Sequence, residues 1–327
     1  MTTQATTPPP AEVAAPAGEK RVSQARRREA RTGWMFVSPF FLLFTLCFLI
    51  PIGFSLYYSF FRQQATGGGL FGNEGGASIS NVFVGFQNYE YVLTSDAFWT
   101  GIGRVLLFGI IQVPLMIGMA LALALLLDSI TVRRPGPWRL SYFLPYAIPG
   151  VVAAVIWTYI YQPSTSPINK ILEGAGAGGV NFFDPNIIIL SMANMTTWTY
   201  TGYNMLIFLA ALQAIPRELY DAARIDGATG FGIIRKIKIP LVRDAALLAI
   251  LLSIIGTVQL FNEPTVLESV NDWMGLDYMP MMMAYNSLMG GITPSGNGPA
   301  SAISIVMALI AGLLAIGYAI LQRRTAP

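Results

Sequence analysis

The residue types that carry out most enzyme chemistry are scarce in this 327-residue sequence. It contains no histidine and one cysteine, Cys47. Histidine is the usual general base near neutral pH and the commonest metal ligand, and a single cysteine can form neither an intrachain disulfide nor a thiolate metal cluster. Serine–histidine triads, zinc hydrolysis and cysteine–histidine catalysis are therefore excluded, and no metal site is expected.

Uncharged hydrogen-bonding and aromatic side chains gather instead in two apolar stretches, 187–214 and 245–261, with Glu263 just beyond the second. Polar groups within a membrane span are costly unless they face a cavity or another helix. Aromatic faces with hydroxyl and amide groups suit a sugar. The predicted substrate pathway comprises Trp198, Thr199, Tyr200, Tyr203, Asn204, Gln259, Asn262 and Glu263. The alternative is that these side chains bond neighbouring helices, a common role of polar residues in membranes.

The apolar stretches contain no cluster of arginine or lysine. Phosphate and carboxylate substrates usually need such donors, so a neutral solute is favoured over glycerol phosphate, amino acids or inorganic anions. A partner subunit could still supply the charge.

A third stretch, residues 215–243, lies between two apolar segments and is predicted to be helical. Pro216 suits the start of a helix, and Glu218 near that end favours the helix dipole. Leu219, Ala222 and Ala223 recur on one helix face, and Gly227 ends the helix. Small residues permit close approach of another surface, which favours a docking element, although a simple connector would show the same spacing.

The elements that position these residues are membrane spans. Hydrophobic residues make up 54% of the chain and charged residues 11%, about half the charged share of a soluble domain. Six apolar runs are long enough to cross a bilayer core, which needs roughly 20 residues per helix. They are 34–60, 101–127, 140–161, 187–214, 245–261 and 300–321. The predicted fold is therefore all-α and polytopic, with residues 1–33 a disordered basic tail and 34–325 the transmembrane domain.

Basic residues are distributed unevenly between the two sides of this arrangement. Seventeen lie in the N-terminal tail, the second and fourth loops and the C-terminal tail, against three on the other side, Arg62, Arg104 and Lys170. With the acidic residues included, the two sides carry +9 and −6. Short cytoplasmic loops are enriched in Lys and Arg, so both termini are predicted to be cytoplasmic. The glycine-rich stretch 67–76 is predicted to be a flexible outer linker.

The stretch Asp221–Ala228, followed by Ile237–Pro240, resembles the EAA motif of binding-protein-dependent ABC importer permeases. That motif reads Glu-Ala-Ala, two variable residues and Asp-Gly-Ala, then Ile-x-Leu-Pro. Asp221 stands for the glutamate and Ile239 for the leucine. Further segments are similar to the sugar-transporting class, closest to the maltose-type permease: Val84–Tyr89, Asp96–Trp99, Leu144–Pro149 with Trp157, and Leu212–Pro216.

The resemblance implies a type I ABC importer permease fold over residues 34–325 and a carbohydrate importer subunit in the bacterial inner membrane. The residues implied to dock on a cytoplasmic ATPase are Asp221, Ala222, Ala223, Asp226, Gly227 and Ala228. The implied partners are a second permease, an ATPase dimer and an extracytoplasmic sugar-binding lipoprotein, with no nucleic acid. Because the chain has no Gly-x-x-x-x-Gly-Lys-Ser/Thr sequence, ATP and Mg²⁺ would act in the ATPase, and this chain needs no cofactor.

Two other classes compete with this interpretation. An ion-gradient-driven secondary transporter would show inverted repeats and ionisable residues at the membrane midplane. A membrane-embedded enzyme would need an acid, base or nucleophile cluster at membrane depth. The predicted spans contain no Asp, Glu, Lys or His deep within them and no cluster of acid, base or nucleophile at membrane depth.

Overall fold

The computed structural model describes residues 17–66, 78–129 and 135–325. Residues 1–16 of the predicted tail and the glycine-rich stretch 67–76 lie outside this part. The chain divides into two units, Met1–Phe54 and Ser55–Pro327, so the division falls later than the predicted boundary at residue 33.

The first unit is helical wherever it is described. It contains α1 (Ala17–Phe44), a π-helical turn η1 (Thr45–Leu49) and the start of α2 (Ile50–Tyr58). Residues 17–33, predicted to be disordered, form the first part of α1. The physical reason is that alanine, glutamate, lysine and arginine, which are all strong helix formers, are frequent there.

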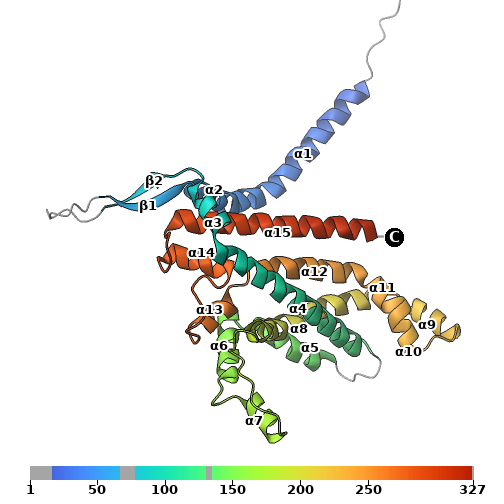
Figure 1. Cartoon of the computed structure of the whole chain (residues 1–327). Coiled ribbons are helices and arrows are strands. Elements are labelled where there is room, and N and C mark those ends of the chain that lie inside the picture. The colour runs from blue at the N-terminus through green and yellow to red at the C-terminus, as the bar shows by residue number, and fades with distance from the viewer. Residues whose placement is uncertain (1–16, 67–77, 130–134, 326–327) are drawn as a thin grey trace, which may run out of the picture. The chain divides into compact units, whose positions relative to one another are not determined.

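The second unit is built of helices with one hairpin (Figure 1). Strands β1 (Phe61–Thr66) and β2 (Ser78–Phe83) pair antiparallel, with Phe61 opposite Phe83. Its helices are α3 (Gln87–Thr94), α4 (Asp96–Leu127), α5 (Pro135–Phe143), η2 (Leu144–Ala147), α6 (Gly150–Tyr161), α7 (Pro167–Gly174), α8 (Ile188–Gln213), α9 (Arg217–Ile225), α10 (Gly230–Ile233), η3 (Ile234–Lys238), α11 (Ile239–Leu241), α12 (Arg243–Val258), α13 (Asn262–Glu268), α14 (Pro280–Met289) and α15 (Asn297–Thr325).

In the described part of the chain, four helical segments are long and apolar enough to cross a membrane: Glu29–Tyr58, Asp96–Leu127, Arg243–Glu268 and Asn297–Gln322. The bent pair formed by Pro135–Ala147 and Gly150–Tyr161 is a fifth span when its two halves are counted as one. Helix α8 has 26 residues, which gives a length of about 39 Å, but its many polar residues lower its mean hydropathy. The structure is consistent with six spans, and that number stays a prediction.

The predicted third span is not a continuous helix. Pro135–Ala147 and Gly150–Tyr161 meet at an angle of 96°. Two prolines explain the break: Pro145 lies in the 3₁₀ turn η2, and Pro149 is the residue before α6. Proline lacks the N–H that a continuing helix needs and disfavours helical geometry in the preceding residue.

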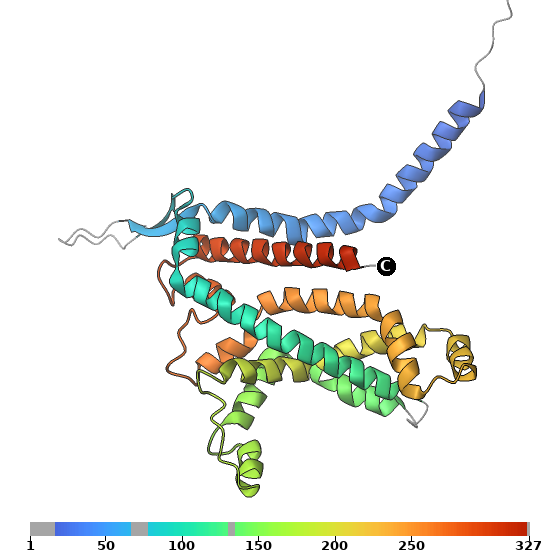
Figure 2. The same ribbon diagram turned by 45° about the vertical axis from the view of Figure 1, so that its right-hand side comes forward.

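Helices α4, α8, α12 and α15 run side by side in both ribbon views (Figure 2), and α4 packs along α8. Glycines allow close approach, as in many membrane helix pairs. A Cβ on Gly109 of α4 would lie 2.9 Å from Thr257 Cγ2 of α12. A Cβ on Gly202 of α8 would collide with the carbonyl oxygen of Tyr142 in α5.

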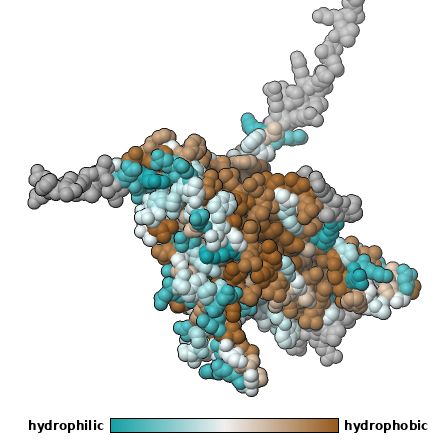
Figure 3. Space-filling model, viewed as in Figure 1, coloured by the Kyte–Doolittle hydropathy of each residue, from teal (hydrophilic) through white to brown (hydrophobic). Residues whose placement is uncertain are grey.

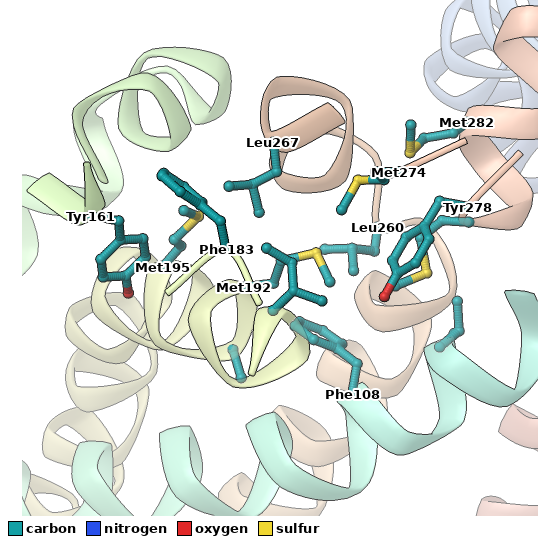
Figure 4. Packing of buried hydrophobic residues seen from close by; sticks show 14 residues of the cluster. Phe108, Tyr161, Phe183, Met192, Met195, Leu260, Leu267, Met274, Tyr278 and Met282 are labelled. Carbon is teal, nitrogen blue, oxygen red and sulfur yellow. The ribbon is translucent and has the colours of Figure 1, made fainter. Parts of the chain in front are cut away.

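Buried apolar residues fill the space between these helices. One cluster joins α4, α8, the α12–α13 junction and the following loop, with Phe108, Met192, Leu260 and Met274 among its members (Figure 4). Figure 3 shows a broad hydrophobic surface over the middle of the second unit, with hydrophilic residues toward α7 and toward α9 and α10. This distribution is typical of a multi-pass membrane protein.

Candidate functional site

A cavity of about 310 Å³ lies among α4, η2, α8 and the junction of α12 with α13. Its walls combine aromatic rings, amides, hydroxyls and one carboxylate. The lining residues are Phe108, Gln112, Met116, Tyr146, Thr196, Tyr200, Tyr203, Asn204, Leu252, Ser253, Gly256, Thr257, Gln259, Leu260, Phe261, Asn262 and Glu263.

Helix geometry explains why α4 and α8 place their residues on the cavity. Phe108, Gln112 and Met116 of α4 are spaced by four, so they share one helix face. On α8, Tyr200 and Tyr203 follow at a spacing of three, next to Asn204. Each helix therefore offers one mixed polar and aromatic stripe to the same space.

Three tyrosines form an aromatic wall. The Tyr146 and Tyr203 rings are stacked, with centroids 4.7 Å apart and planes at 18°. The Tyr200 ring meets Tyr146 edge-on at 5.9 Å. Tyr146 lies in η2, so the break between α5 and α6 brings its ring against α8. Such a wall offers aromatic faces and phenol hydroxyls to a solute.

Amides on the cavity wall are held in place by local bonds. Asn204 Nδ2 donates to the Tyr200 carbonyl oxygen at 3.0 Å. Gln112 Nε2 donates to Met116 Sδ at 3.2 Å. Sulfur is a weak acceptor, so the Gln112 amide can exchange this contact for a stronger partner.

The junction between α12 and α13 supplies the last wall. Helix α12 ends at Val258, and α13 begins at Asn262, so residues 259–261 interrupt the span. Irregular backbone at membrane depth occurs where it is buried in protein or lines a cavity. The Asn262 side chain lies against Gly150 of α6, where a Cβ would come within 2.5 Å of its Nδ2.

The cavity lining contains an acidic side chain but no basic one. Glu263 is 6% exposed, and no lysine or arginine belongs to the lining, all of which is within the described part of the chain. Arg104 of α4 is engaged elsewhere: its Nη1 donates to the Tyr278 carbonyl oxygen at 3.0 Å, and its guanidinium lies 4.0 Å from that ring's centroid. Burial raises the pKa of the Tyr278 phenol, and the Arg104 charge partly offsets this.

The structure brings six of the eight predicted pathway residues together on this cavity: Tyr200, Tyr203, Asn204, Gln259, Asn262 and Glu263. It places the other two elsewhere on α8. The Trp198 ring packs edge-on against Trp157 at 5.8 Å. The Thr199 hydroxyl donates to the Met195 carbonyl oxygen at 3.0 Å. Trp198 therefore packs on a neighbouring helix, as the alternative for this helix states, whereas the Thr199 hydrogen bond stays within α8.

Eleven of the seventeen lining residues are not in the predicted pathway: Phe108, Gln112, Met116, Tyr146, Thr196, Leu252, Ser253, Gly256, Thr257, Leu260 and Phe261. A signal existed for Gln112, because it is an isolated amide in the apolar stretch 105–127. Tyr146 lies between two prolines, a sign of irregular backbone, but the sequence does not indicate that this backbone bends against α8.

The predicted docking residues lie together on and just after α9. Gly227 has φ +80° and follows the helix, where its N–H donates to the Arg224 carbonyl oxygen at 3.0 Å. Asp221 pairs with Arg224 at 3.1 Å on the surface. Of the six docking residues, Asp221, Ala222, Asp226 and Gly227 are exposed, and Ala223 and Ala228 are half-buried.

The surface around α9 is also partly apolar. Leu219 is exposed, and Ile225 is 87% exposed. Phe231 of α10 is exposed as well. Exposed apolar groups beside charged ones are typical of protein–protein contact sites. Among the described residues, no group of three or more metal-ligating side chains is placed to hold a metal ion.

Residues 136–327 match the family of binding-protein-dependent transport system inner membrane components. The lactose transport system permease protein LacF of Rhizobium radiobacter is 32% identical over 74% of this chain and 77% of that protein. The sn-glycerol-3-phosphate transport system permease protein UgpA of Agrobacterium fabrum is 27% identical over 89% of this chain and 94% of that protein.

The fold is shared with a bacterial alginate ABC transporter crystallised with its alginate pentasaccharide-bound periplasmic protein. The TM-score is 0.73 at 19% identity, covering 91% of this chain and 96% of that chain. With more than half of its sequence matched, the chain belongs to the binding-protein-dependent transport system inner membrane components, and it is a membrane permease.

Proposed function

We propose that this chain is one permease subunit of an ATP-driven carbohydrate importer and that the solute it passes is neutral. The observation that carries this proposal is the lining of the cavity: hydroxyls, amides and three tyrosine rings, with Glu263 as its one carboxyl group. Sugars present C–H patches that pack on aromatic rings and hydroxyls that bond amides and carboxylates.

The cavity lining indicates the charge of the solute, whereas the relatives are named for solutes of different charge. LacF is named for lactose, a neutral sugar, and UgpA for a phosphate ester. An anionic solute would enter a space with a buried carboxylate and without a basic group to pair with it, and burying an unpaired charge is unfavourable. This favours a neutral carbohydrate.

The proposed assembly contains this chain, a second similar permease, two copies of a cytoplasmic ATPase and a sugar-binding lipoprotein outside the membrane. Both termini are cytoplasmic in this proposal, as the basic loops predict. Asp221, Ala222, Ala223, Asp226, Gly227 and Ala228 dock on the ATPase, which binds ATP and Mg²⁺. The exposed position of α9 supports this assignment.

The test is uptake by the purified complex in proteoliposomes, with ATP on the ATPase side and binding protein on the other. Lactose, maltose and trehalose serve as neutral probes, and sn-glycerol 3-phosphate serves as the anionic one. We expect ATP-dependent uptake of a neutral sugar and none of the phosphate ester. Uptake of the phosphate ester alone would refute the neutral assignment, and sugar uptake by this chain alone, driven by a proton gradient, would refute the ATP-driven mechanism.

A further inference from the structure

Asp128, at the end of α4, lies against Lys238, the last residue of η3. The Lys238 Nζ and Asp128 Oδ2 atoms are 2.5 Å apart, although 110 residues separate them in sequence. Their side chains are only 13% and 16% exposed. In the Asp221–Arg224 pair, by contrast, the Asp221 side chain is 68% exposed and the Arg224 side chain is 52% exposed. Solvent screens an exposed pair, whereas a largely buried pair holds its two elements together.

The position of Asp128 is unfavourable without this partner. It is the C-cap of α4, where its N–H donates back to Ala124 and Leu126. The carbonyl end of a helix carries partial negative charge and attracts cations, so a carboxylate is repelled there. The positive charge of Lys238 offsets both the Asp128 carboxylate and the negative end of the α4 dipole. The pair therefore stabilises the position of η3 at the end of α4.

Tyr220 connects α9 to the Asp128–Lys238 ion pair. The Lys238 Nζ lies 5.3 Å from the centroid of the Tyr220 ring, within the range of a cation–π contact. The ring also packs on a buried cluster that includes Leu127 of α4, Leu212 of α8 and Val242 before α12. Burial first, and the Asp128 charge second, raise the pKa of the Tyr220 phenol, so the ring stays neutral beside the ion pair.

Apart from Tyr220, helix α9 packs sparsely on the described helices. Of its other residues, Ala223 is half-buried and the rest are exposed. The segment that carries Lys238 is a π-helix, Ile234–Lys238, an irregularity that is frequent at functional sites. Movement of α9 can therefore be transmitted to Asp128 through two successive contacts, Tyr220 with Lys238 and Lys238 with Asp128.

Helix α4 carries that route to the cavity. Met116, Gln112 and Phe108 lie 12, 16 and 20 positions before Asp128 on the same continuous helix. All three line the cavity. Pro114 lies within α4 between Gln112 and Met116 and removes one backbone hydrogen bond of the helix there. Met116 is on the same side of this proline as Asp128, so displacement of the cytoplasmic end of α4 shifts Met116 relative to α8.

We infer that Asp128, Lys238 and Tyr220 form a mechanical link that transmits movement of α9 to α4 and so couples ATP hydrolysis to the opening of the cavity. This inference rests on the proposed function. The three are positioning residues, since none lines the cavity. We call this group the α4 link.

The test uses the complete complex in proteoliposomes, with the neutral disaccharide among lactose, maltose and trehalose that the wild type takes up fastest. The variants are Asp128→Asn, Lys238→Gln and the charge-swapped double variant Asp128→Lys with Lys238→Asp. The readout is ATP hydrolysed per sugar molecule imported. Each single variant is expected to raise this ratio by about tenfold, an effect within the usual range of pairwise coupling, and the swap is expected to restore most of the coupling.

The matched controls are Asp244→Asn and Lys236→Gln, which remove the same charges from exposed residues nearby. They should leave the ratio unchanged. If the single variants do not assemble, Tyr220→Ala leaves both charges in place and should raise the ratio in the same direction. Tyr220→Phe keeps the ring and should behave as the wild type.

The outcomes separate the two ideas. If the wild-type complex couples ATP hydrolysis to sugar uptake and the assembled α4-link variants do so equally well, the link is refuted and the proposed function stands. The link is also refuted if the swap is as uncoupled as the single variants. A wild-type complex that imports no sugar with ATP refutes the proposed function and the link with it.

Discussion

Replacing Tyr203 with alanine would remove one of the two stacked rings of the cavity wall. The Tyr146–Tyr203 pair, 4.7 Å between centroids, contributes about 0.5–1.5 kcal/mol beyond its buried area. A sugar that stacks on this wall loses a similar contact. The stacking of the two tyrosines is present with and without sugar, so the lost sugar contact alone raises the transfer barrier. A loss of about 0.5–1.5 kcal/mol corresponds to a roughly two- to thirteenfold lower rate.

The assay is initial sugar uptake by the complex in proteoliposomes as a function of the concentration of loaded binding protein. We expect kcat to fall and the KM for loaded binding protein to change by less than about twofold, because docking of that protein takes place outside the cavity. Tyr203→Phe keeps the ring and should retain most of the rate, which would assign the effect to stacking and not to the hydroxyl.

Tyr159→Ala is the matched control, since this tyrosine is 69% exposed on α6 and does not line the cavity. It should transport normally. Wild-type kcat for Tyr203→Ala would refute the aromatic wall as part of the sugar path. A rise in the KM for loaded binding protein with constant kcat would instead assign Tyr203 to docking.

Three further predictions concern other parts of the chain. Gly227→Trp should abolish sugar uptake while the chain still inserts in the membrane, because a bulky residue at φ +80° is strained by about 1–2 kcal/mol and blocks close approach at α9; normal uptake would contradict the docking assignment. Glu263→Lys should lower uptake of neutral sugar and admit sn-glycerol 3-phosphate. The measurement is competition between the two solutes for uptake, with Glu268→Lys as the control variant; unchanged selectivity would show that Glu263 does not set the charge preference. Gly202→Ala should lower the yield of folded chain in detergent, because its Cβ meets the Tyr142 carbonyl oxygen and such overpacking costs about 1–3 kcal/mol; an unchanged thermal transition would contradict the tight packing of α5 on α8.

The sequence predicts well the features that depend on local pattern. The end of α9 at Gly227 follows from glycine chemistry, and the membrane helices follow from long apolar runs. Tyr200, Tyr203 and Asn204 could be proposed as lining because a polar stripe on an apolar helix must face something other than lipid. Trp198 and Thr199 belong to the same polar run, but helix rotation turns them toward Trp157 and the Met195 carbonyl oxygen.

Features that depend on contacts distant in sequence could not be predicted. The 96° bend between α5 and α6 needs both prolines and the packing of Tyr146 on α8. Gln112 and Met116 line the cavity because α4 packs along α8 with a particular rotation, which hydropathy does not define. The Asp128–Lys238 pair joins residues 110 positions apart, and neither charge is unusual in a loop rich in basic residues.

The bend between α5 and α6 constrains how the chain is made. Helix α5 has 9 residues and α6 has 12, which correspond to about 14 Å and 18 Å, so neither half can cross a hydrocarbon core of about 30 Å by itself. The two halves must therefore enter the bilayer as one segment. The tyrosines on α8 that pack on Tyr146 at the bend are synthesised more than fifty residues later. Ribosome-bound chains that end before α8 should therefore hold residues 135–161 as a straighter insertion intermediate, and the bend, with the cavity beside it, is completed only after α8 has entered the membrane.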